Sequence, residues 1–225
     1  MKKLLAVIIA AALLLSGCTS ASRPAESAPP TGTPSPSPTP IVTPTPEPEP
    51  ADGELVLVRD YIPGIFIDLK YATTDNFTGR VIYDSDEAYL RYGTVKKLLC
   101  AQNELSGRGL SLKIWDAYRP VSAQFKLWEI CPNPVYVSDP NNGYSKHSRA
   151  NTVDITLVTD TGESISMPSG FDDFTSLADR DYSDVSAEAA ENARLLENVM
   201  VENGFVPYSG EWWHYSDSVA YDVYG

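Results

Sequence analysis

The chain has 225 residues, a formal net charge of −13 and only two histidines. Residues 1–50 are neutral overall, so the whole negative charge lies on residues 51–225. Such a sequence excludes a nucleic-acid-binding protein, because binding to phosphates depends on clustered cations. All 23 aromatic residues also follow residue 50, which predicts one domain of about 175 residues with a hydrophobic core.

The N-terminus carries the pattern of an export signal. Lys2 and Lys3 precede an unbroken apolar run, Leu4 to Leu15. The run is shorter than the ~20 residues of a membrane-spanning helix but matches the apolar region of a secretory signal. It ends in Leu15-Ser16-Gly17-Cys18, which resembles the lipobox of bacterial lipoproteins, where the signal is cleaved before an acylated cysteine. An ordinary signal peptide with an incidental cysteine is the alternative.

Residues 1–17 are therefore expected to be a lipoprotein signal peptide, with Cys18 lipid-anchored at the extracytoplasmic face of the bacterial membrane. Residues 18–53 predict a disordered tether, because eleven of the eighteen prolines lie between Pro24 and Pro50. Proline-rich chains favour an extended polyproline conformation of about 3.1 Å per residue. The tether would hold a domain of residues 54–225 away from the membrane.

The two remaining cysteines, Cys100 and Cys131, do not have the C-x-x-C spacing of a metal or redox motif. Outside the cell they would form one disulfide, or they would remain two buried thiols. Neither case gives them a catalytic role.

The first half of the domain predicts a strand, a helix and a second strand. Residues Ile65 to Tyr71 alternate with period two, which indicates a half-buried strand. Apolar residues follow a helical spacing from Asp86 to Leu105, and glycines come directly after. Leu110 to Trp115 is predicted to be the next strand.

A turn at Tyr118-Arg119-Pro120 then introduces a short helix, since proline suits the first helical position. This helix carries Phe125, Leu127 and Trp128. Residues 131–144 are rich in proline, asparagine and glycine and predict a loop.

The second half continues with Thr152 to Val158, the most β-prone run, which contains the single acid Asp154. Ser186 is placed to cap a helix from Ala187 to Asn203. Two closing strands are expected, at Phe205-Val206 and at Glu211 to Tyr215. Strands and helices are interspersed without a regular βαβ repeat, so we expect an α+β fold with a small, mainly antiparallel sheet and flanking helices.

The residues that carry chemistry include both histidines. His147 lies seven residues before Asp154, and His214 lies sixty residues after it. Two imidazoles and a carboxylate match a catalytic zinc site, which keeps its fourth position open to water. A hydrogen-bonded structural role is the alternative for each histidine, and a salt bridge to arginine is the alternative for Asp154.

Glu211 lies three residues before His214 and is a candidate for the base that takes a proton from water. Residues three apart face opposite sides of an ideal strand. The two side chains can therefore share a site only if the strand bends, bulges or ends between them.

Arg119 follows the predicted end of a strand, where side chains often project into a site. Its permanent charge suits stabilisation of an oxyanion. An ordinary ion pair with one of the many carboxylates is the alternative.

Three motifs in this order resemble the zinc D-alanyl-D-alanine dipeptidases of the VanX type. They are Asp-Ala-Tyr-Arg-Pro (116–120), Ser-Lys-His-Ser-Arg (145–149) with Asp154, and Glu-Trp-Trp-His (211–214). Shorter matching stretches occur at residues 70–79, 160–163 and 167–172. The resemblance covers residues from about Ile65 to Tyr215.

The resemblance implies hydrolysis of D-Ala-D-Ala, or of related wall-derived peptides, with one Zn²⁺ per chain. It implies that His147, Asp154 and His214 bind zinc, with Glu211 as general base and acid and Arg119 stabilising the tetrahedral intermediate. Asp172 and Ser145 would hold the dipeptide, with Asp172 pairing with its free ammonium. The implied fold is the zinc-peptidase scaffold shared with D,D-carboxypeptidases and hedgehog-like domains.

Two features depart from the family pattern. Ala150 and Thr152 stand where the family favours Gly and Ala, and the loop from Pro132 to Tyr144 is short. The export signal also contrasts with the cytoplasmic placement of the best-known members. A D,D-carboxypeptidase acting on peptidoglycan stem peptides, or a non-catalytic zinc-binding module, therefore remains an alternative function.

Overall fold

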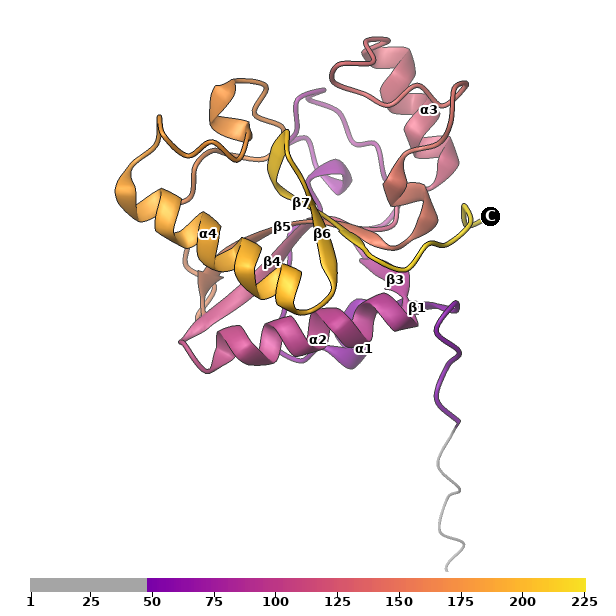
Figure 1. The fold of residues 1–225 in the computed structure, drawn as a ribbon. Helices are drawn as coiled ribbons and strands as arrows, with labels where there is room; N and C mark the ends of the chain where they lie inside the picture. The colour runs from indigo at the N-terminus through magenta and orange to yellow at the C-terminus, as the bar shows by residue number, and fades with distance from the viewer. Residues whose placement is uncertain (1–47) are drawn as a thin grey trace, which may run out of the picture. The chain divides into compact units, whose positions relative to one another are not determined.

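The computed structural model describes residues 48–225, so the predicted signal peptide, Cys18 and most of the tether lie outside the described residues (Figure 1). No helix within residues 48–225 has the length and apolar character needed to cross a membrane.

A central sheet of five strands has the order β2-β4-β5-β7-β6. The short edge strand β2 runs parallel to β4, and all other neighbours in the sheet are antiparallel. This arrangement confirms the expected α+β fold with a mainly antiparallel sheet. The strands span Phe66–Ile67 (β2), Leu110–Asp116 (β4), Thr152–Thr159 (β5), Phe205–Tyr208 (β6) and Glu211–Asp217 (β7).

A separate two-stranded sheet pairs β1 with β3. The remaining elements are α-helices and three short 3-10 helices. Their bounds are Leu55–Leu57 (β1), Tyr89–Arg91 (β3), Val58–Tyr61 (α1), Tyr92–Ser106 (α2), Val121–Ile130 (α3), Ala187–Glu202 (α4), Lys70–Ala72 (η1), Lys146–Arg149 (η2) and Ser176–Ala178 (η3).

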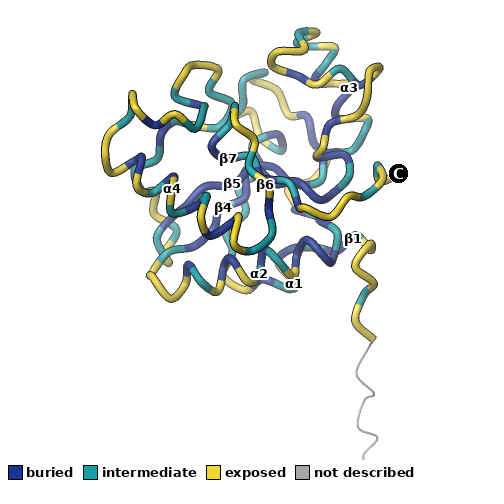
Figure 2. The backbone as a smooth tube through the Cα atoms, in the orientation of Figure 1, coloured by how far each residue is buried: buried dark blue, intermediate teal, exposed yellow. Residues whose placement is uncertain are grey.

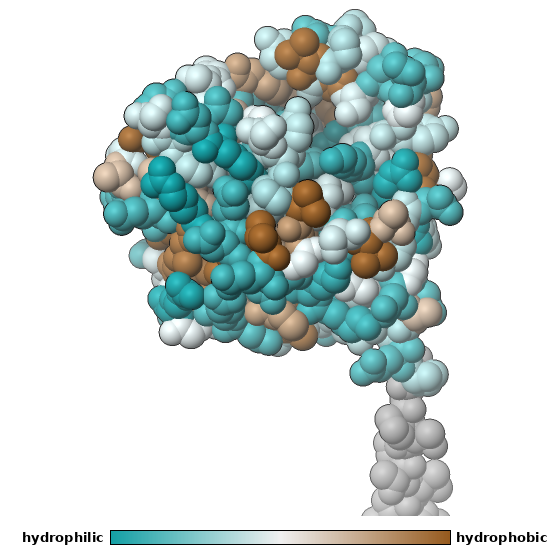
Figure 3. Space-filling model, in the orientation of Figure 1, coloured by the Kyte–Doolittle hydropathy of each residue, from teal (hydrophilic) through white to brown (hydrophobic). Residues whose placement is uncertain are grey.

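Helices α2 and α4 lie next to each other against one face of the central sheet, and α3 with the long connections lies on the other side (Figure 1). Strand β5 is the centre of the core, since residues 152–158 are all buried (Figure 2). The face of the molecule in Figure 3 is mostly hydrophilic, with apolar side chains scattered over it. Because α2 and α4 cover one face of the sheet, a site can form only on the other side, among the long connections.

Two sequence predictions about element boundaries are wrong. The helix expected from Asp86 begins only at Tyr92, because residues 89–91 pair instead with β1. The strand expected over 65–71 is limited to Phe66–Ile67. After it the chain turns into η1, where the Tyr71 carbonyl accepts hydrogen bonds from two backbone amides of the following loop. Long-range pairing outweighed the local pattern in both cases.

Other local predictions are confirmed. The strand over 110–115, the loop over 131–144 and both closing strands are present. The Ser186 side chain accepts a hydrogen bond from the Ala189 backbone N–H at the start of α4. The short helix follows Pro120, which occupies its N-cap rather than its first helical position. The cysteine prediction is wrong in both forms, because Cys100 and Cys131 are free thiols and neither is buried: Cys100 is exposed and Cys131 is half-buried.

Arg91 joins three distant parts of the chain. Its guanidinium donates to the backbone carbonyls of Gly53, Arg149 and Asp222 at 2.7, 3.1 and 2.8 Å. It also lies over the rings of Tyr221 and Tyr224. One side chain thus ties the start of the domain and its last residues to the segment that contains His147.

Replacing Arg91 with alanine is expected to lower the free energy of unfolding by about 2 kcal/mol, since charged donors make the stronger hydrogen bonds. Urea unfolding of the full chain measures this loss. The same change at Arg59, which is exposed in α1, is the matched control and should have little effect. Equal stability of the two variants would contradict the role of Arg91.

Candidate active site

His147 lies in η2, a turn that is capped at its start by the side chain of Ser145. The Ser145 hydroxyl accepts a hydrogen bond from the His147 N–H at 3.3 Å and caps the turn. The turn ends at Ala150, whose φ of 59° is in the left-handed region. Glycine adopts this region without strain, whereas few residues with a side chain do. Ala150 still permits the same turn.

The ring of His147 is oriented by the backbone carbonyl of Ala117. Its Nδ1 lies 2.9 Å from the Ala117 oxygen, so Nδ1–H is the donor and Nε2 is left with a free lone pair. A fixed tautomer of this kind is typical of a histidine that binds a metal.

Asp154 is the third residue of β5 and lies opposite Asp116 on β4 and His214 on β7. On the β4 side, the pairing shifts register between Ile114 and Asp116. Asp154 as a whole is only 3% exposed. Burial of a carboxylate is costly unless it has partners, so Asp154 requires the groups beside it.

The strand β7 bulges between Glu211 and His214. Tyr208 of β6 pairs with Glu211, whereas the neighbouring Pro207 pairs with Tyr215, so extra residues of β7 are accommodated at this point. This is the irregularity that a shared site required. Glu211 Oε2 lies 3.4 Å from His214 Nδ1.

The three predicted ligands meet at one point. Asp154 Oδ2 lies 3.2 Å from His147 Nε2, and Asp154 Oδ1 lies 2.9 Å from His214 Nδ1. The two ring nitrogens are 3.4 Å apart, and all three ligand atoms lie within 4.8 Å of one another. Two imidazole nitrogens and a carboxylate oxygen fit a tetrahedral zinc ion with one open position.

The charges of this cluster are strongly coupled. Although burial opposes its ionisation, His147 and His214 hold the pKa of Asp154 well below its usual value. Burial also opposes protonation of His147, but Asp154 and Asp116 raise its pKa overall. Burial and the nearby Asp154 raise the pKa of Glu211, which makes that carboxylate a stronger proton acceptor.

Arg119 lines the same cleft and also forms the ion pair that was the alternative for it. Its Nη2 lies 2.6 Å from Asp116 Oδ2, and its Nη1 donates to Gln124 Oε1 at 2.9 Å. Arg119 as a whole is only 9% exposed, and its guanidinium lies over the ring of Tyr71. These contacts fix the direction of a permanent positive charge beside the three ligands.

Asp172 lies at another wall of the cleft. Its Oδ2 accepts a hydrogen bond from the Tyr71 hydroxyl at 2.7 Å. Burial raises its pKa to about 7, although the Tyr71 hydroxyl opposes this change. The backbone φ of Asp172 is 54°, which few non-glycine residues adopt. Strain of this kind is often retained at functional positions.

A cleft of about 280 Å³ joins all the predicted site residues. The sequence analysis did not predict a role for several residues in or next to the cleft. One of them is Asp116, which is buried and contacts Arg119 from outside the cleft lining. Tyr71, in one of the matching stretches, positions Asp172, and Gln124 positions Arg119. The sequence does contain a signal for Asp116, since a charged residue at the end of an apolar strand indicates a buried group that needs a partner. The predicted residues that line the cleft are Arg119, Ser145, His147, Asp154, Asp172, Glu211 and His214.

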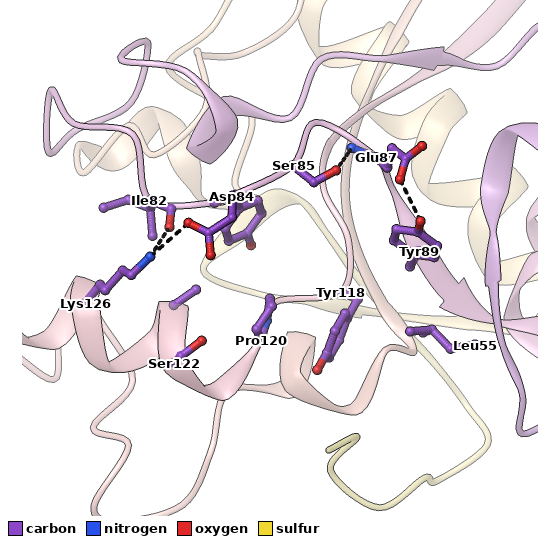
Figure 4. A pocket seen from close by; sticks show the side chains of 12 residues that line it. Leu55, Ile82, Asp84, Ser85, Glu87, Tyr89, Tyr118, Pro120, Ser122 and Lys126 are labelled. Atoms are coloured by element: carbon purple, nitrogen blue, oxygen red, sulfur yellow. Dashed lines mark hydrogen bonds and ion pairs between the residues drawn. The ribbon is translucent and has the colours of Figure 1, made fainter.

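A second hollow of similar volume lies beside the start of α3 (Figure 4). Lys126 contacts Asp84 and the Ile82 carbonyl at one end, and Glu87 accepts from the Tyr89 hydroxyl at the other. Tyr83 is shared between the two regions, since its ring lines this hollow and its hydroxyl donates to Asp116. The polar groups of this second hollow mainly form hydrogen bonds and ion pairs with one another, and they do not form a group of metal ligands like that in the first cleft.

Comparison with known proteins gives consistent matches. Residues 51–222 match the Peptidase_M15 family model, described as D-ala-D-ala dipeptidase. The chain is 39% identical to D-alanyl-D-alanine dipeptidase of Escherichia coli (strain K12), over 72% of this chain and 83% of the relative. The corresponding proteins of Enterococcus faecium and Streptomyces coelicolor are 35% and 36% identical, covering 69% and 73% of this chain and 87% and 91% of the relatives. The solved structure of VanYB in complex with D-Alanine-D-Alanine aligns at 16% identity with a TM-score of 0.41, covering 69% of this chain and 86% of VanYB.

Asp172→Asn is expected to stabilise the metal-free protein at pH 8 but not at pH 4. The folded state binds the Asp172 proton more tightly than the unfolded chain does, so stability is lost as the pH rises from 3.8 towards 7. Asparagine removes this loss and still accepts from Tyr71. Urea unfolding in the presence of a chelator, at both pH values, measures the difference. An equal effect of the substitution at the two pH values would show that Asp172 does not titrate in this range.

Proposed function

Because the chain belongs to the D-Ala-D-Ala dipeptidase family of peptidases, Peptidase_M15, we propose that its cleft hydrolyses D-alanyl-D-alanine to two D-alanines. The membership confirms the resemblance drawn from the sequence motifs and makes the protein a zinc metallopeptidase that acts on cell-wall peptides. The single observation that carries the assignment is the convergence of His147, Asp154 and His214 beside Glu211 in one cleft.

His147, Asp154 and His214 are the residues that hold the zinc ion. His147 offers Nε2, because its Nδ1–H is engaged by the Ala117 carbonyl. When bound, zinc supplies a Lewis acid that polarises the peptide carbonyl and lowers the pKa of water towards ~7.

Glu211 accepts the proton of the attacking water and then donates it to the leaving amine. Its side chain lies at the same cluster, 3.4 Å from His214, and remains partly open to the cleft. The raised pKa of Glu211 favours both steps, because the group has to bind a proton and release it within one cycle.

Arg119 stabilises the negative charge that develops on the carbonyl oxygen. A guanidinium already held by Asp116 and Gln124 needs little reorganisation when that charge appears. The partner carboxylate reduces the local charge of Arg119, but it also fixes the position of the donor groups.

Asp172 pairs with the free ammonium of the dipeptide, and Ser145 contributes to the wall beside it. The carboxyl is close to half-ionised at neutral pH in the absence of a ligand, because its pKa is about 7. A bound ammonium favours the ionised form, so substrate binding and deprotonation of Asp172 support each other.

Glu211→Gln is expected to reduce kcat for D-Ala-D-Ala by about 10²- to 10⁴-fold, the usual contribution of a general base, while zinc stays bound. Release of D-alanine and metal content are the two measurements. Removal of zinc with a chelator should abolish turnover in the parent protein as well.

The exposed Glu163 provides the matched control, since Glu163→Gln makes the same change outside the cleft and should leave kcat unchanged. A zinc-loaded parent protein that binds the dipeptide without hydrolysing it would instead favour the non-catalytic binding module.

We further propose that the enzyme is a lipoprotein held at the extracytoplasmic face of the membrane by Cys18, with residues 18–53 as its tether. The support is the lipobox-like sequence after an apolar run and the proline-rich segment that follows it.

Cys18→Ser is expected to abolish incorporation of a labelled fatty acid into the protein in a bacterial host. Cys100→Ser is the matched control and should retain the label, because Cys100 belongs to the folded domain. A parent protein that takes up no label would overturn the lipid anchor without affecting the assignment of the cleft.

A further inference from the structure

Four aromatic rings form a continuous row around the Asp172 end of the cleft. The row begins at Tyr71, which donates to Asp172, and continues through Phe77 and Phe174 to Tyr136. The centroids of successive rings are 6.4, 5.4 and 4.4 Å apart. Tyr71 and Phe77 come from one stretch of the chain, whereas Tyr136 and Phe174 come from two others, so the row joins segments that are distant in sequence.

The last contact of the row connects two walls of the cleft. Tyr136 belongs to residues 134–138, which line the cleft on one side. Phe174 lies two residues after Asp172, which lines the cleft on another side. The contact between Tyr136 and Phe174 therefore spans from one wall to the other beside the group that is proposed to bind the substrate ammonium.

Both walls are held firmly. Phe171 packs against Tyr71 and Trp115, and the Asp173 side chain accepts hydrogen bonds from the backbone N–H and hydroxyl of Thr175. On the opposite wall, Val137 is buried and the Ser138 carbonyl accepts from Gln124 Nε2 at 2.6 Å. Gln124 is also the acceptor for Arg119, so the Tyr136 wall is tied to the catalytic guanidinium.

Burial in the core does not explain the positions of Phe174 and Tyr136, the last two rings of the row. Tyr136 is 46% exposed and Phe174 is 45% exposed. Aromatic side chains contribute most to stability when they are fully buried. Their contact at the cleft therefore points to a role in shaping it.

We propose that the Tyr136–Phe174 contact sets the length of the peptide that the enzyme accepts. This inference rests on the proposed dipeptidase function and deepens it. A dipeptide ends at the ammonium that pairs with Asp172, whereas a longer peptide continues past that point towards the rings. The contact excludes the additional residue, and the short loop over 132–144 is thus sufficient to close the cleft.

Two barriers to longer peptides can be separated. An acylated substrate lacks the ammonium and leaves Asp172 without its charged partner, which no change in the rings repairs. The space needed by the added group is controlled by the rings alone. Shortening a ring is therefore expected to raise activity on longer substrates selectively, without restoring it to the level of the dipeptide.

The test compares zinc-loaded full-length Tyr136→Ala and Phe174→Ala variants with the parent protein. The substrates are D-Ala-D-Ala and an acetylated tripeptide that ends in D-Ala-D-Ala, and D-alanine release is measured. In each variant the ratio of kcat/KM for the tripeptide to kcat/KM for the dipeptide should rise by about tenfold. Tyr136→Phe, which keeps the ring, should retain the parent ratio.

Tyr144→Ala is the matched control, because Tyr144 is an equally exposed tyrosine of the same loop that does not line the cleft. Its ratio should equal that of the parent protein, which separates a specific effect from general loosening of the loop.

The outcomes distinguish this inference from the function on which it rests. A parent protein that hydrolyses the tripeptide as well as the dipeptide would overturn the closed cleft and favour the carboxypeptidase. Unchanged ratios in both ring variants, with normal dipeptide turnover, would overturn the inference and leave the dipeptidase function intact. Absence of turnover on either substrate would overturn the proposed function itself.

Discussion

The buried carboxylate of Asp154 is the constraint on which the rest of the site depends. It lies in the most buried strand of the sheet, where water cannot satisfy its charge. His147 and His214 approach it from a 3-10 helix and from the next strand, and together they hold its pKa low. A bound cation would also stabilise the charge of Asp154. The same three side chains, His147, Asp154 and His214, can therefore stabilise a buried carboxylate and bind a metal ion.

Irregular backbone next to Asp154 makes this arrangement possible. Strands β4 and β7 both shift register close to it. The shift in β7 lets Glu211 and His214 serve one cleft, although a regular strand would place them on opposite faces. Bulges of this kind are common beside active sites, because they redirect a side chain without breaking the sheet. The fold thus places the buried carboxylate next to irregular backbone that directs its partners towards it.

Around the cluster, a ring of supporting contacts keeps the charged groups in place. Asp116 holds Arg119, Gln124 links Arg119 to the loop that carries Tyr136, and Tyr71 holds Asp172. Arg91 anchors the segment of His147 from behind. The supporting residues Asp116, Gln124, Tyr71 and Arg91 have no proposed chemical role. Each of them limits the motion of a residue that has one. Preorganisation of this kind reduces the cost of stabilising charge as it develops.

By itself, the sequence determined the α+β class, most strands and helices, and the identity of the candidate ligands and base. Residue type and local spacing carry that information, as with Asp154 in an apolar run and Ser186 before α4. Only the tertiary structure decided where α2 begins, that the strand at Ile65 is short, and that Asp116, Gln124 and Tyr136 support the cleft. Those features depend on partners far away in the chain, such as β1 for residues 89–91 and Phe174 for Tyr136. The local spacing of residues does not indicate such partners, because they come together only when the chain folds.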